Sequence, residues 1–503
     1  MTAPAAPKKR KPPHRSFDPR LAFRPDVLSE AVTHHKNGSY DAAWFLYQKL
    51  DTESVARGRG PHWHARMMAA LLWYQRTSKI DFDVAPDLPP QFGNNYRTVI
   101  GMLEDVVLHL PKWADPRYNL GVILEGLGRI DEAAKHFQKA IDIDDAYAEA
   151  WVNLGNCKLH QGDVAGAKQC FETAESLNPD DALAKYNLMH ALALFGEWDA
   201  AFERYEYRYL VPGHLRDHGL PKLVPQWDGE TYVDRLIVTD EQGAGDILQY
   251  ARFLPFLEAR AGKVYCRVRH PALLPLLEAN FPRVTFFGTD DRVPKADAHI
   301  PLLSCVSRLK VSEAEVPTPG GYLVPPTTTT GTLFKGVVWK HPTSNTETIA
   351  SAAPLVVGVC WAGSPTHKRD ATRSIPFDTF RPILDVPGVR FINLTVGERA
   401  KVSHPALTQL RFEDYADTSR VVAGCGLVIS VDTSVLHLSG ALGVPTWGLI
   451  GASGDMRWML NRDDTPWYSS VRLWRQPTHN DWTSVIERVT AELHIRASKL
   501  VRE

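Results

Sequence analysis

Three short segments of this sequence contain the residue types and spacings that could carry chemistry. The first is the turn Gly243-Ala-Gly245-Asp246, which follows an apolar, strand-like run and precedes a helical stretch from Ile247 to Arg260. Glycines let backbone amides approach a ligand closely, and a helix N-terminus favours anions. We expect Asp246 to project into a cleft at this turn, although an Asp at a helix start is also an ordinary cap.

The second segment combines a Gly-bearing turn with cations. Trp361-Ala-Gly363-Ser364 follows an apolar run, and Lys368 and Arg373 come soon after it. Such a turn with nearby positive charges suits a diphosphate, since cations form the strongest hydrogen bonds to phosphate oxygens. The alternative is a solvated basic loop.

The third segment places polar groups where a strand ends and a helix starts. Asp432 ends the strand, Thr433 and Ser434 start the helix, and His437 lies one turn further on. Polar side chains at such a place are candidates for a functional site. The alternative is that Asp432 or Thr433 only caps the helix and that His437 packs in the core.

A helical repeat precedes these segments. Arg117-Tyr-Asn-Leu-Gly121 aligns with Trp151-Val-Asn-Leu-Gly155 at an offset of 34 residues, and Tyr186-Asn-Leu begins a third copy. The period and pattern resemble the tetratricopeptide repeat. Each unit is predicted to be a helix, a glycine turn and a second helix, with turns at Gly128, Gly162 and Gly196. Arrays of this kind present a concave face that binds a protein segment, or they only support a neighbouring domain or a dimer interface.

Weaker copies extend the array towards the N-terminus, so we expect it to start near residue 24. A Pro-rich insertion over 81–94 interrupts it before a helix from Asn95 to Leu110. The last repeat helix, Ala200 to Tyr209, is rich in large aromatic residues. We expect this helix to pack on the domain that follows.

Strands alternate with helices after residue 213, which argues for parallel α/β sheets. A stretch rich in Pro, Thr, Ser and Gly separates two such series. Two Rossmann-like lobes of this kind bind ligands at the carboxyl ends of their strands. The predicted organisation is a basic tail over 1–23, a tetratricopeptide array over 24–213, a first lobe over 214–340, a linker over 341–353 and a second lobe over 354–503.

Composition excludes several function classes. The formal net charge of -1 argues against a nucleic-acid-binding surface, which needs a broad basic field. No apolar run is long enough to span a bilayer, and no secretory signal is evident. The six cysteines are scattered and form no CxxC pair, which favours free thiols, no metal site and a cytoplasmic location.

Taken in order, the motifs resemble those of a known enzyme family. GAGD, WAGS with RSIP, VDTSVLHLSGALGVPTW and DMRWML with TPWYSSVRLWRQ are similar to bacterial glycosyltransferases of GT-B fold. The nearest are tetratricopeptide-linked relatives of the ADP-heptose:lipopolysaccharide heptosyltransferases. The resemblance covers roughly residues 235 to 495 and the array ahead of them.

This resemblance implies transfer of a sugar from a nucleotide-diphosphate donor, with inversion, without a metal and without a cofactor. Asp246 matches the general base. The remaining candidate residues match the donor-binding segments: Gly243, Gly245, Trp361, Gly363, Ser364, Lys368, Arg373, Asp432, Thr433, Ser434 and His437. The heptosyltransferases have a lysine near the position of Arg373, so arginine or Lys368 would supply that charge here.

Three functions remain open at this point. The first is an active glycosyltransferase whose array recruits a protein acceptor. The second is a repeat scaffold or binding protein with inactive lobes. The third is a lipopolysaccharide or other saccharide glycosyltransferase whose repeats serve oligomerisation, for example as a homodimer.

Overall fold

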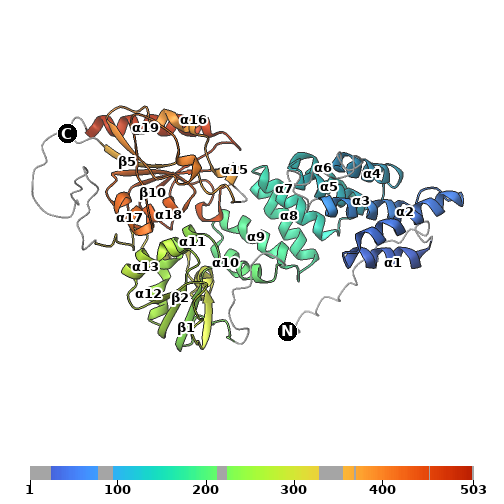
Figure 1. Ribbon diagram of the computed structural model, residues 1–503, viewed down its shortest axis with the longest axis horizontal. Coiled ribbons are helices and arrows are strands. Elements are labelled where there is room, and N and C mark those ends of the chain that lie inside the picture. The colour runs from blue at the N-terminus through green and yellow to red at the C-terminus, as the bar shows by residue number, and fades with distance from the viewer. Residues whose placement is uncertain are drawn as a thin grey trace, which may run out of the picture. The chain divides into compact units, whose positions relative to one another are not determined.

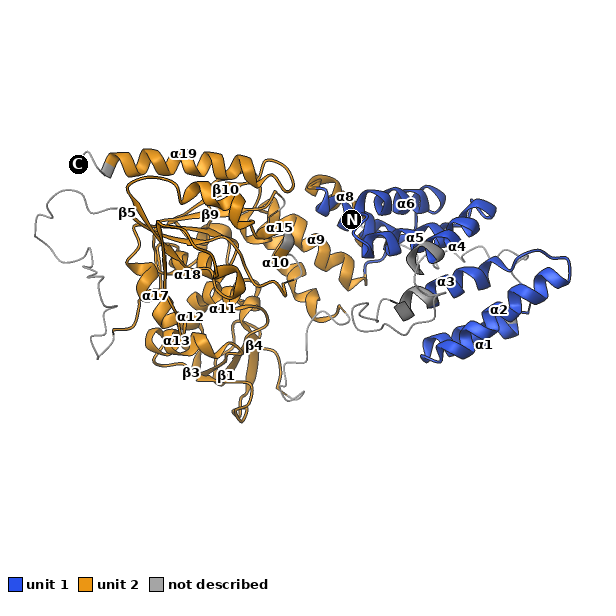
Figure 2. Cartoon of the chain, turned by 45° about the horizontal axis from the view of Figure 1, so that its top comes forward, with its two compact units in different colours: residues 1–161, 176–179 blue, residues 162–175, 180–503 orange. Residues whose placement is uncertain are grey.

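The protein consists of helical repeats followed by two parallel-sheet α/β lobes, as predicted (Figure 1). This computed structural model describes residues 24–77, 95–211, 224–327, 355–367, 370–452 and 454–500. The basic segment 1–23, the Pro-rich insertion 81–94, the 341–353 linker and Lys368 lie outside the described residues. The chain divides into two compact units, of which the second contains both lobes (Figure 2).

The first unit contains residues up to Gln161 together with 176–179. Its described helices pack in chain order, each against the next. They are α1 (Pro25–Lys36), α2 (Tyr40–Ala56), α3 (Trp63–Thr77), α4 (Asn95–His109), α5 (Ala114–Gly126), α6 (Ile130–Ile143) and α7 (Ala148–His160).

The glycines that the repeat period places between paired helices do form turns there. Gly128, Gly162 and Gly196 follow the first helix of successive repeats with positive φ angles of 74°, 83° and 78°. Gly121 has a different role, because a Cβ atom at this position would lie 2.6 Å from the Phe137 ring. The two helices of that repeat therefore approach more closely than a side chain at 121 would allow.

The boundary between the units falls inside the array. The second unit includes 162–175 and everything from Asp180 onward. It therefore contains most of α8 (Val164–Leu177) and the whole last repeat, which comprises α9 (Ala182–Leu194), α10 (Trp198–Tyr205) and the 3₁₀ turn η3 (Glu206–Tyr209).

The last repeat packs on the α/β lobes, which confirms that expectation. The Arg208 guanidinium, fully buried, pairs with the Glu241 carboxylate at 2.8 Å and donates to the Ser304 hydroxyl at 2.7 Å. Gln242 donates to the Tyr205 hydroxyl at 3.1 Å. The last repeat thus touches the loop that leads directly to Asp246.

The first lobe has a four-stranded parallel sheet in the order β3-β2-β1-β4. Its strands are β1 (Val233–Thr239), β2 (Ala261–Arg267), β3 (Thr285–Phe287) and β4 (Ala298–Pro301). Its helices and turns are α11 (Ala244–Tyr250), η4 (Ala251–Phe253), α12 (Leu254–Glu258), η5 (Pro271–Leu273), α13 (Leu274–Asn280), η6 (Leu302–Ser304), α14 (Cys305–Arg308) and η7 (Glu313–Glu315). The single helix predicted over 247–260 is therefore divided into α11, η4 and α12.

The second lobe has a six-stranded parallel sheet in the order β10-β9-β8-β5-β6-β7. Its strands are β5 (Leu355–Cys360), β6 (Val389–Asn393), β7 (Leu407–Gln409), β8 (Leu427–Val431), β9 (Thr446–Ile450) and β10 (Val471–Arg475). The short strand β7 has no counterpart among the strands predicted from the sequence. Its helices and turns are α15 (Asp370–Arg373), α16 (Phe377–Phe380), η8 (Arg381–Ile383), η9 (Glu398–Ala400), α17 (Tyr415–Ala423), α18 (Ser434–Ala441), η10 (Met456–Trp458) and α19 (Trp482–Leu500).

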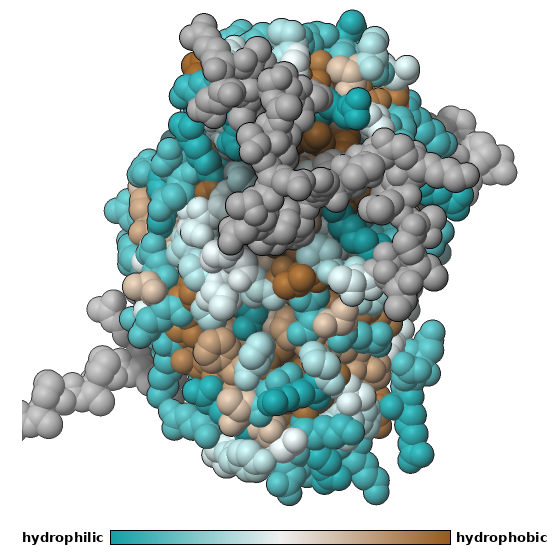
Figure 3. Space-filling view, turned by 90° about the vertical axis from the view of Figure 1, so that its left-hand side faces the viewer, coloured by the Kyte–Doolittle hydropathy of each residue, from teal (hydrophilic) through white to brown (hydrophobic). Residues whose placement is uncertain are grey.

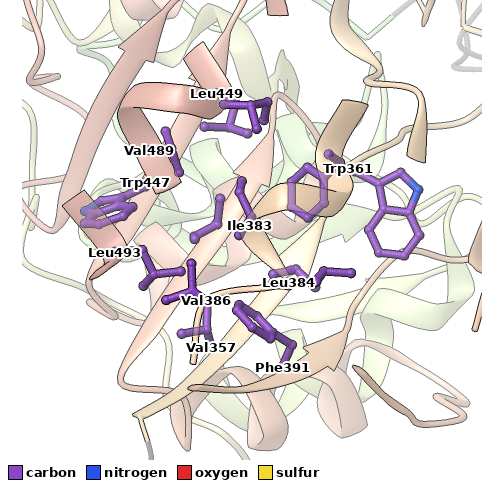
Figure 4. Close-up of a cluster of buried hydrophobic side chains, with 14 of the residues drawn as sticks. Val357, Trp361, Ile383, Leu384, Val386, Phe391, Trp447, Leu449, Val489 and Leu493 are labelled. Carbon is purple, nitrogen blue, oxygen red and sulfur yellow. The ribbon is translucent and has the colours of Figure 1, made fainter. Parts of the chain in front are cut away.

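Helices cover both faces of this second sheet. Figure 1 shows α16 and α19 on one face and α17 and α18 on the other. Buried aliphatic and aromatic residues of the strands fill the space beneath α19, including Val357, Phe391 and Leu449 (Figure 4). Such a core fixes the strand ends, and with them the loops that carry polar side chains.

The two lobes meet where α11 packs against α18. A second junction lies after η7 in the chain, where the Tyr322 and Leu323 amides donate to the Ala441 carbonyl at 2.8 and 3.0 Å. Hydrophilic and hydrophobic residues are interspersed over the side of the lobes shown in Figure 3. Within the described residues, we find no helix with the length and apolar character needed to cross a membrane.

Candidate functional site

Asp246 lies in the first turn of α11, just beyond the carboxyl end of β1. Its Oδ2 atom accepts a hydrogen bond from the Gly243 amide at 2.8 Å, so the carboxylate does cap the helix. Its Oδ1 atom is bound by the Arg457 guanidinium, which comes from η10 in the other lobe. The residue therefore has both a local structural contact and a contact across the lobes.

The surroundings of Asp246 shift the pKa of its carboxyl group. Burial raises the pKa of the Asp246 carboxyl above its ordinary value, Arg457 acts in the opposite direction, and the nearby Asp455 carboxylate raises it further. A carboxylate with a raised pKa is a stronger proton acceptor once ionised. Arg457 also lies 3.3 Å from Asp455, so the cation is placed between two carboxylates.

The segment 432–437 joins β8 to α18. Thr433 has an extended backbone and precedes the first helical residue, Ser434. The Thr433 hydroxyl lies 3.3 Å from the Ser430 hydroxyl, and Ser434 accepts a hydrogen bond from the Tyr415 hydroxyl at 2.8 Å. The first backbone N–H groups of a helix have no partner within it, so the start of α18 can bind an anion.

His437 is buried, and its ring is held on two sides. Nδ1 lies 3.0 Å from the Tyr468 hydroxyl, and the Trp458 indole stacks on the imidazole with centroids 5.5 Å apart. Burial, followed by the charge of Arg457, holds the pKa of His437 well below its usual value. The ring is therefore neutral near pH 7, and it can exchange hydrogen bonds but supplies no positive charge.

Gly245 allows α11 to approach His437. A Cβ atom at position 245 would lie 2.7 Å from the Cδ2 atom of His437. The GAGD turn and the 432–437 segment, about 190 residues apart in the chain, therefore lie side by side. The structure thus brings Asp246 and His437 together from separate lobes.

Arg373 and Gly363 form the third part of the site. The Arg373 guanidinium donates to the Asp432 carbonyl at 3.1 Å, and it lies so close to Gly363 that a Cβ atom there would be 2.6 Å from Nη2. Arg373 thus binds the residue that precedes Thr433, the N-cap of α18. Ser364 is exposed, and its hydroxyl lies 2.9 Å from that of Thr366.

The Trp361 indole lies in the hydrophobic core of the second lobe. Figure 4 shows this indole, which is 1% exposed. It packs against Phe377 and Phe380, with ring centroids 5.2 and 5.6 Å away. It also lines a cavity of about 610 Å³ in the second lobe, together with Asp370, Ser374 and Arg399 among others. Asp246, Asp432 and His437 do not line that cavity, so we do not place the chemistry there.

Sequence analysis did not assign roles to Arg457, Asp455, Trp458 or Tyr468. All four belong to the DMRWML and TPWYSSVRLWRQ segments, which contributed to the family resemblance. The signal that pointed to them was the run of charged and aromatic residues after the glycines that follow β9. This run of residues does not reveal that Arg457 contacts Asp246 of the other lobe.

Comparison with known proteins identifies the repeats directly. Residues 124–191 match the tetratricopeptide repeat family. TPR repeat-containing protein PA0015 of Pseudomonas aeruginosa is 34% identical over 74 residues, covering 14% of this chain and 70% of that protein.

Two further similarities extend over the α/β lobes. Protein FlbA of Caulobacter vibrioides is 25% identical over 473 residues, covering 81% of this chain and 76% of that protein. A solved structure of a Thermobaculum terrenum O-GlcNAc transferase mutant aligns with 88% of this chain and 94% of its own, with 13% identity and a TM-score of 0.31.

Proposed function

The chain belongs to the tetratricopeptide-repeat proteins, and we propose that its α/β lobes form a glycosyltransferase of GT-B type. The enzyme moves a sugar from a nucleotide-diphosphate-sugar donor to an acceptor. The observation that carries this proposal is the contact between Asp246 of the first lobe and Arg457 of the second, beside the N-terminus of α18. A buried base and an anion site from opposite lobes are what such a transfer requires.

The donor's diphosphate is placed at the start of α18. Backbone N–H groups there and the Thr433 and Ser434 hydroxyls are the neutral donors, and Arg373 adds a positive charge next to Asp432. Lys368 is a further candidate cation. These groups can stabilise a leaving diphosphate without a metal, because fixed donors aimed at developing charge lower the barrier directly. No cofactor is part of the proposal.

The transfer step is a displacement at the anomeric carbon of the donor sugar. A nucleophilic oxygen or nitrogen of the acceptor forms a bond to that carbon, and its proton passes to the Asp246 carboxylate. The bond from the carbon to the diphosphate oxygen breaks, and the nucleoside diphosphate leaves with the electron pair. Attack opposite the leaving group inverts the configuration. The motif order of the ADP-heptose:lipopolysaccharide heptosyltransferases supports this arrangement, but it does not specify heptose as the sugar.

The acceptor in this proposal is a protein that the repeat array recruits. Tetratricopeptide arrays stack their helices into a surface suited to an extended protein segment. The array here is joined to the lobe that carries Asp246 through buried contacts of the last repeat. A segment bound by the repeats would therefore be held by the same chain that carries the base.

The proposed location is the cytoplasm. All six cysteines are buried and lie outside disulfides in the described structure. Burial raises the pKa of the Cys157 and Cys425 thiols to about 12, so both stay protonated and unreactive. Buried thiols that form no disulfide are typical of a reducing compartment.

Donor turnover tests the proposal. The full chain is incubated with a panel of nucleotide sugars, and nucleoside diphosphate release is compared among wild type, Asp246→Asn and Asp234→Asn. Asp234 is an exposed carboxylate on β1 of the same lobe, so its variant controls for the loss of a charge. We expect Asp246→Asn to lose about a hundredfold or more of the rate and the control to lose little. Equal turnover in all three proteins would remove Asp246 from the mechanism.

Acceptor choice needs a second experiment. Candidate acceptor proteins are co-expressed with the full chain and measured by intact mass spectrometry, so that an added mass identifies both the acceptor and the class of sugar. If the protein binds a partner but no nucleoside diphosphate, it is an inactive repeat scaffold. If it transfers sugar only to lipopolysaccharide or another saccharide, the array does not recruit a protein acceptor.

A further inference from the structure

Arg457 is a nearly buried cation of the site. Its side chain is 10% exposed, and it forms ion pairs with Asp246 and, at 3.3 Å, with Asp455. It approaches Asp246 from η10, whereas Asp246 lies on α11 of the other lobe. A buried guanidinium needs anionic partners, because its desolvation costs several kcal/mol that only strong pairing offsets.

Arg457 and Arg373 each have a hydrogen-bond donor with no acceptor among the described protein atoms. In the part of the chain that the structure describes, the buried Nε atoms of Arg457 and Arg373 have no hydrogen-bond partner. Both charges act on Asp432 and His437, so both lie around the start of α18. A buried donor without an acceptor is costly. A ligand with many acceptor oxygens would satisfy both groups.

We propose that Arg457 binds the Asp246 carboxylate only while the donor is absent and moves to the donor's diphosphate when the donor binds, so that donor binding releases the catalytic base. This inference rests on the proposed glycosyltransferase function. A diphosphate carries more negative charge and more acceptor oxygens than one carboxylate, and arginine binds phosphate with two parallel hydrogen bonds. Asp246 and the donor therefore compete for one guanidinium.

The exchange has a chemical consequence for the base. Burial raises the pKa of the Asp246 carboxyl, and Arg457 is the charged side chain that lowers it. Once Arg457 has turned to the diphosphate, the carboxylate keeps the effect of burial and loses its counter-charge, so it attracts the acceptor's proton more strongly. The acceptor is then activated only after the donor is in place. The cation released from the base stabilises the leaving group in the same step.

Calorimetric binding of nucleoside diphosphates to the full chain tests this exchange. The probes are ADP, GDP, UDP, CDP and dTDP, and the proteins are wild type, Asp246→Asn, Arg457→Gln, the double variant and the Asp234→Asn control. We use the nucleotide that binds wild type. We expect Asp246→Asn to bind it at least about threefold more tightly, because Arg457 is no longer shared between Asp246 and the diphosphate. We expect Arg457→Gln to bind it about tenfold more weakly. In the Arg457→Gln background, Asp246→Asn should no longer tighten binding.

Two results would overturn the exchange. One is that Asp246→Asn leaves the affinity unchanged or weakens it. The other is that it tightens binding equally in both backgrounds, since Asp246 would then only repel the diphosphate. If Arg457→Gln alone fails to fold, Asp246→Asn is compared with the double variant, in which neither charge of the pair remains. Equal affinities of those two proteins contradict the proposal, and a tenfold advantage for Asp246→Asn supports it.

A failure of the proposed function has a different signature. In that case no nucleoside diphosphate binds wild type, and Asp246→Asn has no affinity to change. Binding by wild type without the expected coupling leaves the transferase proposal standing and rejects only the exchange by Arg457.

Discussion

The indole of Trp198, in the last repeat, stacks on that of Trp467, in the second lobe, with ring centroids 5.2 Å apart and 29° between the planes. A backbone bond supports the same junction, because the Leu460 amide donates to the Leu194 carbonyl at 2.8 Å. Leu460 follows closely after Arg457 in the chain. The last repeat therefore touches both loops of the site: the one before Asp246 and the one after Arg457.

Truncation should show where the folding unit begins. We expect a chain that starts at residue 162 to fold and to bind the same nucleoside diphosphate as the full chain. A chain that starts at residue 214 would expose Trp467 and leave the buried Glu241 without its cation, so it should be insoluble or melt at a much lower temperature. Soluble yield and thermal unfolding of both fragments check this. A well-folded fragment that starts at 214 would contradict it.

The buried pair between Arg208 and Glu241 should be worth more than an exposed pair. Arg208→Met leaves an unpaired buried carboxylate, and we expect a loss of about 3–5 kcal/mol in unfolding free energy. Arg472→Met is the control, because Arg472 pairs with Asp463 at 3.6 Å where both side chains are exposed, and it should cost about 1 kcal/mol or less. Urea unfolding followed by tryptophan fluorescence measures both. Equal effects would mean that the buried pair is not important for the junction.

Gly245 should not tolerate a side chain. The methyl group of Gly245→Ala would meet the His437 ring at 2.7 Å, which forces α11 away from α18. We expect a loss of about 1–3 kcal/mol in stability and weaker donor binding. Gly101→Ala in α4 is the control, since a Cβ atom there meets nothing within 4 Å, and it should stabilise its helix by about 0.5–1 kcal/mol. Thermal unfolding distinguishes the two, and an unchanged Gly245→Ala protein would argue against the close approach.

The pH dependence of kcat/KM should report Asp246 and not His437. The base acts as a carboxylate, so the rate rises with pH as the carboxyl loses its proton, and its raised pKa places this limb above the usual range of aspartate. Arg457 lowers that pKa, so Arg457→Gln should move the limb to higher pH. His437 has a pKa well below its ordinary value, so it stays neutral and adds no limb between about pH 6 and 8. A limb in that range that disappears in His437→Gln would contradict this assignment.

The sequence predicted the architecture better than the site. A 34-residue period and alternating strands and helices determine local structure, so the repeats and most strands follow from patterns along the chain. The short strand β7 was missed because three residues, only one of them buried, give no pattern. The division of the helix predicted over 247–260 was missed because its apolar residues suit one helix or three short pieces.

The site depends on contacts between residues far apart in the chain, which local patterns do not encode. Asp246 and His437 were both identified as candidates, but the reason for Gly245 between them is the imidazole ring of the other lobe. Arg457 was missed because one arginine in a run of charged and aromatic residues has no distinguishing local signal. Its role follows only from the carboxylates around it.

The boundary between the compact units affects how such proteins can gain or exchange repeats during evolution. Repeats ahead of residue 162 belong to a compact unit of their own, so recombination can add, remove or replace them as whole repeats. The last repeat cannot be exchanged so freely, because its Arg208 is matched to a buried carboxylate of the first lobe. A chimaera given a new array should therefore keep its own residues from Ala182 onward, and related genes should inherit that last repeat together with the lobes.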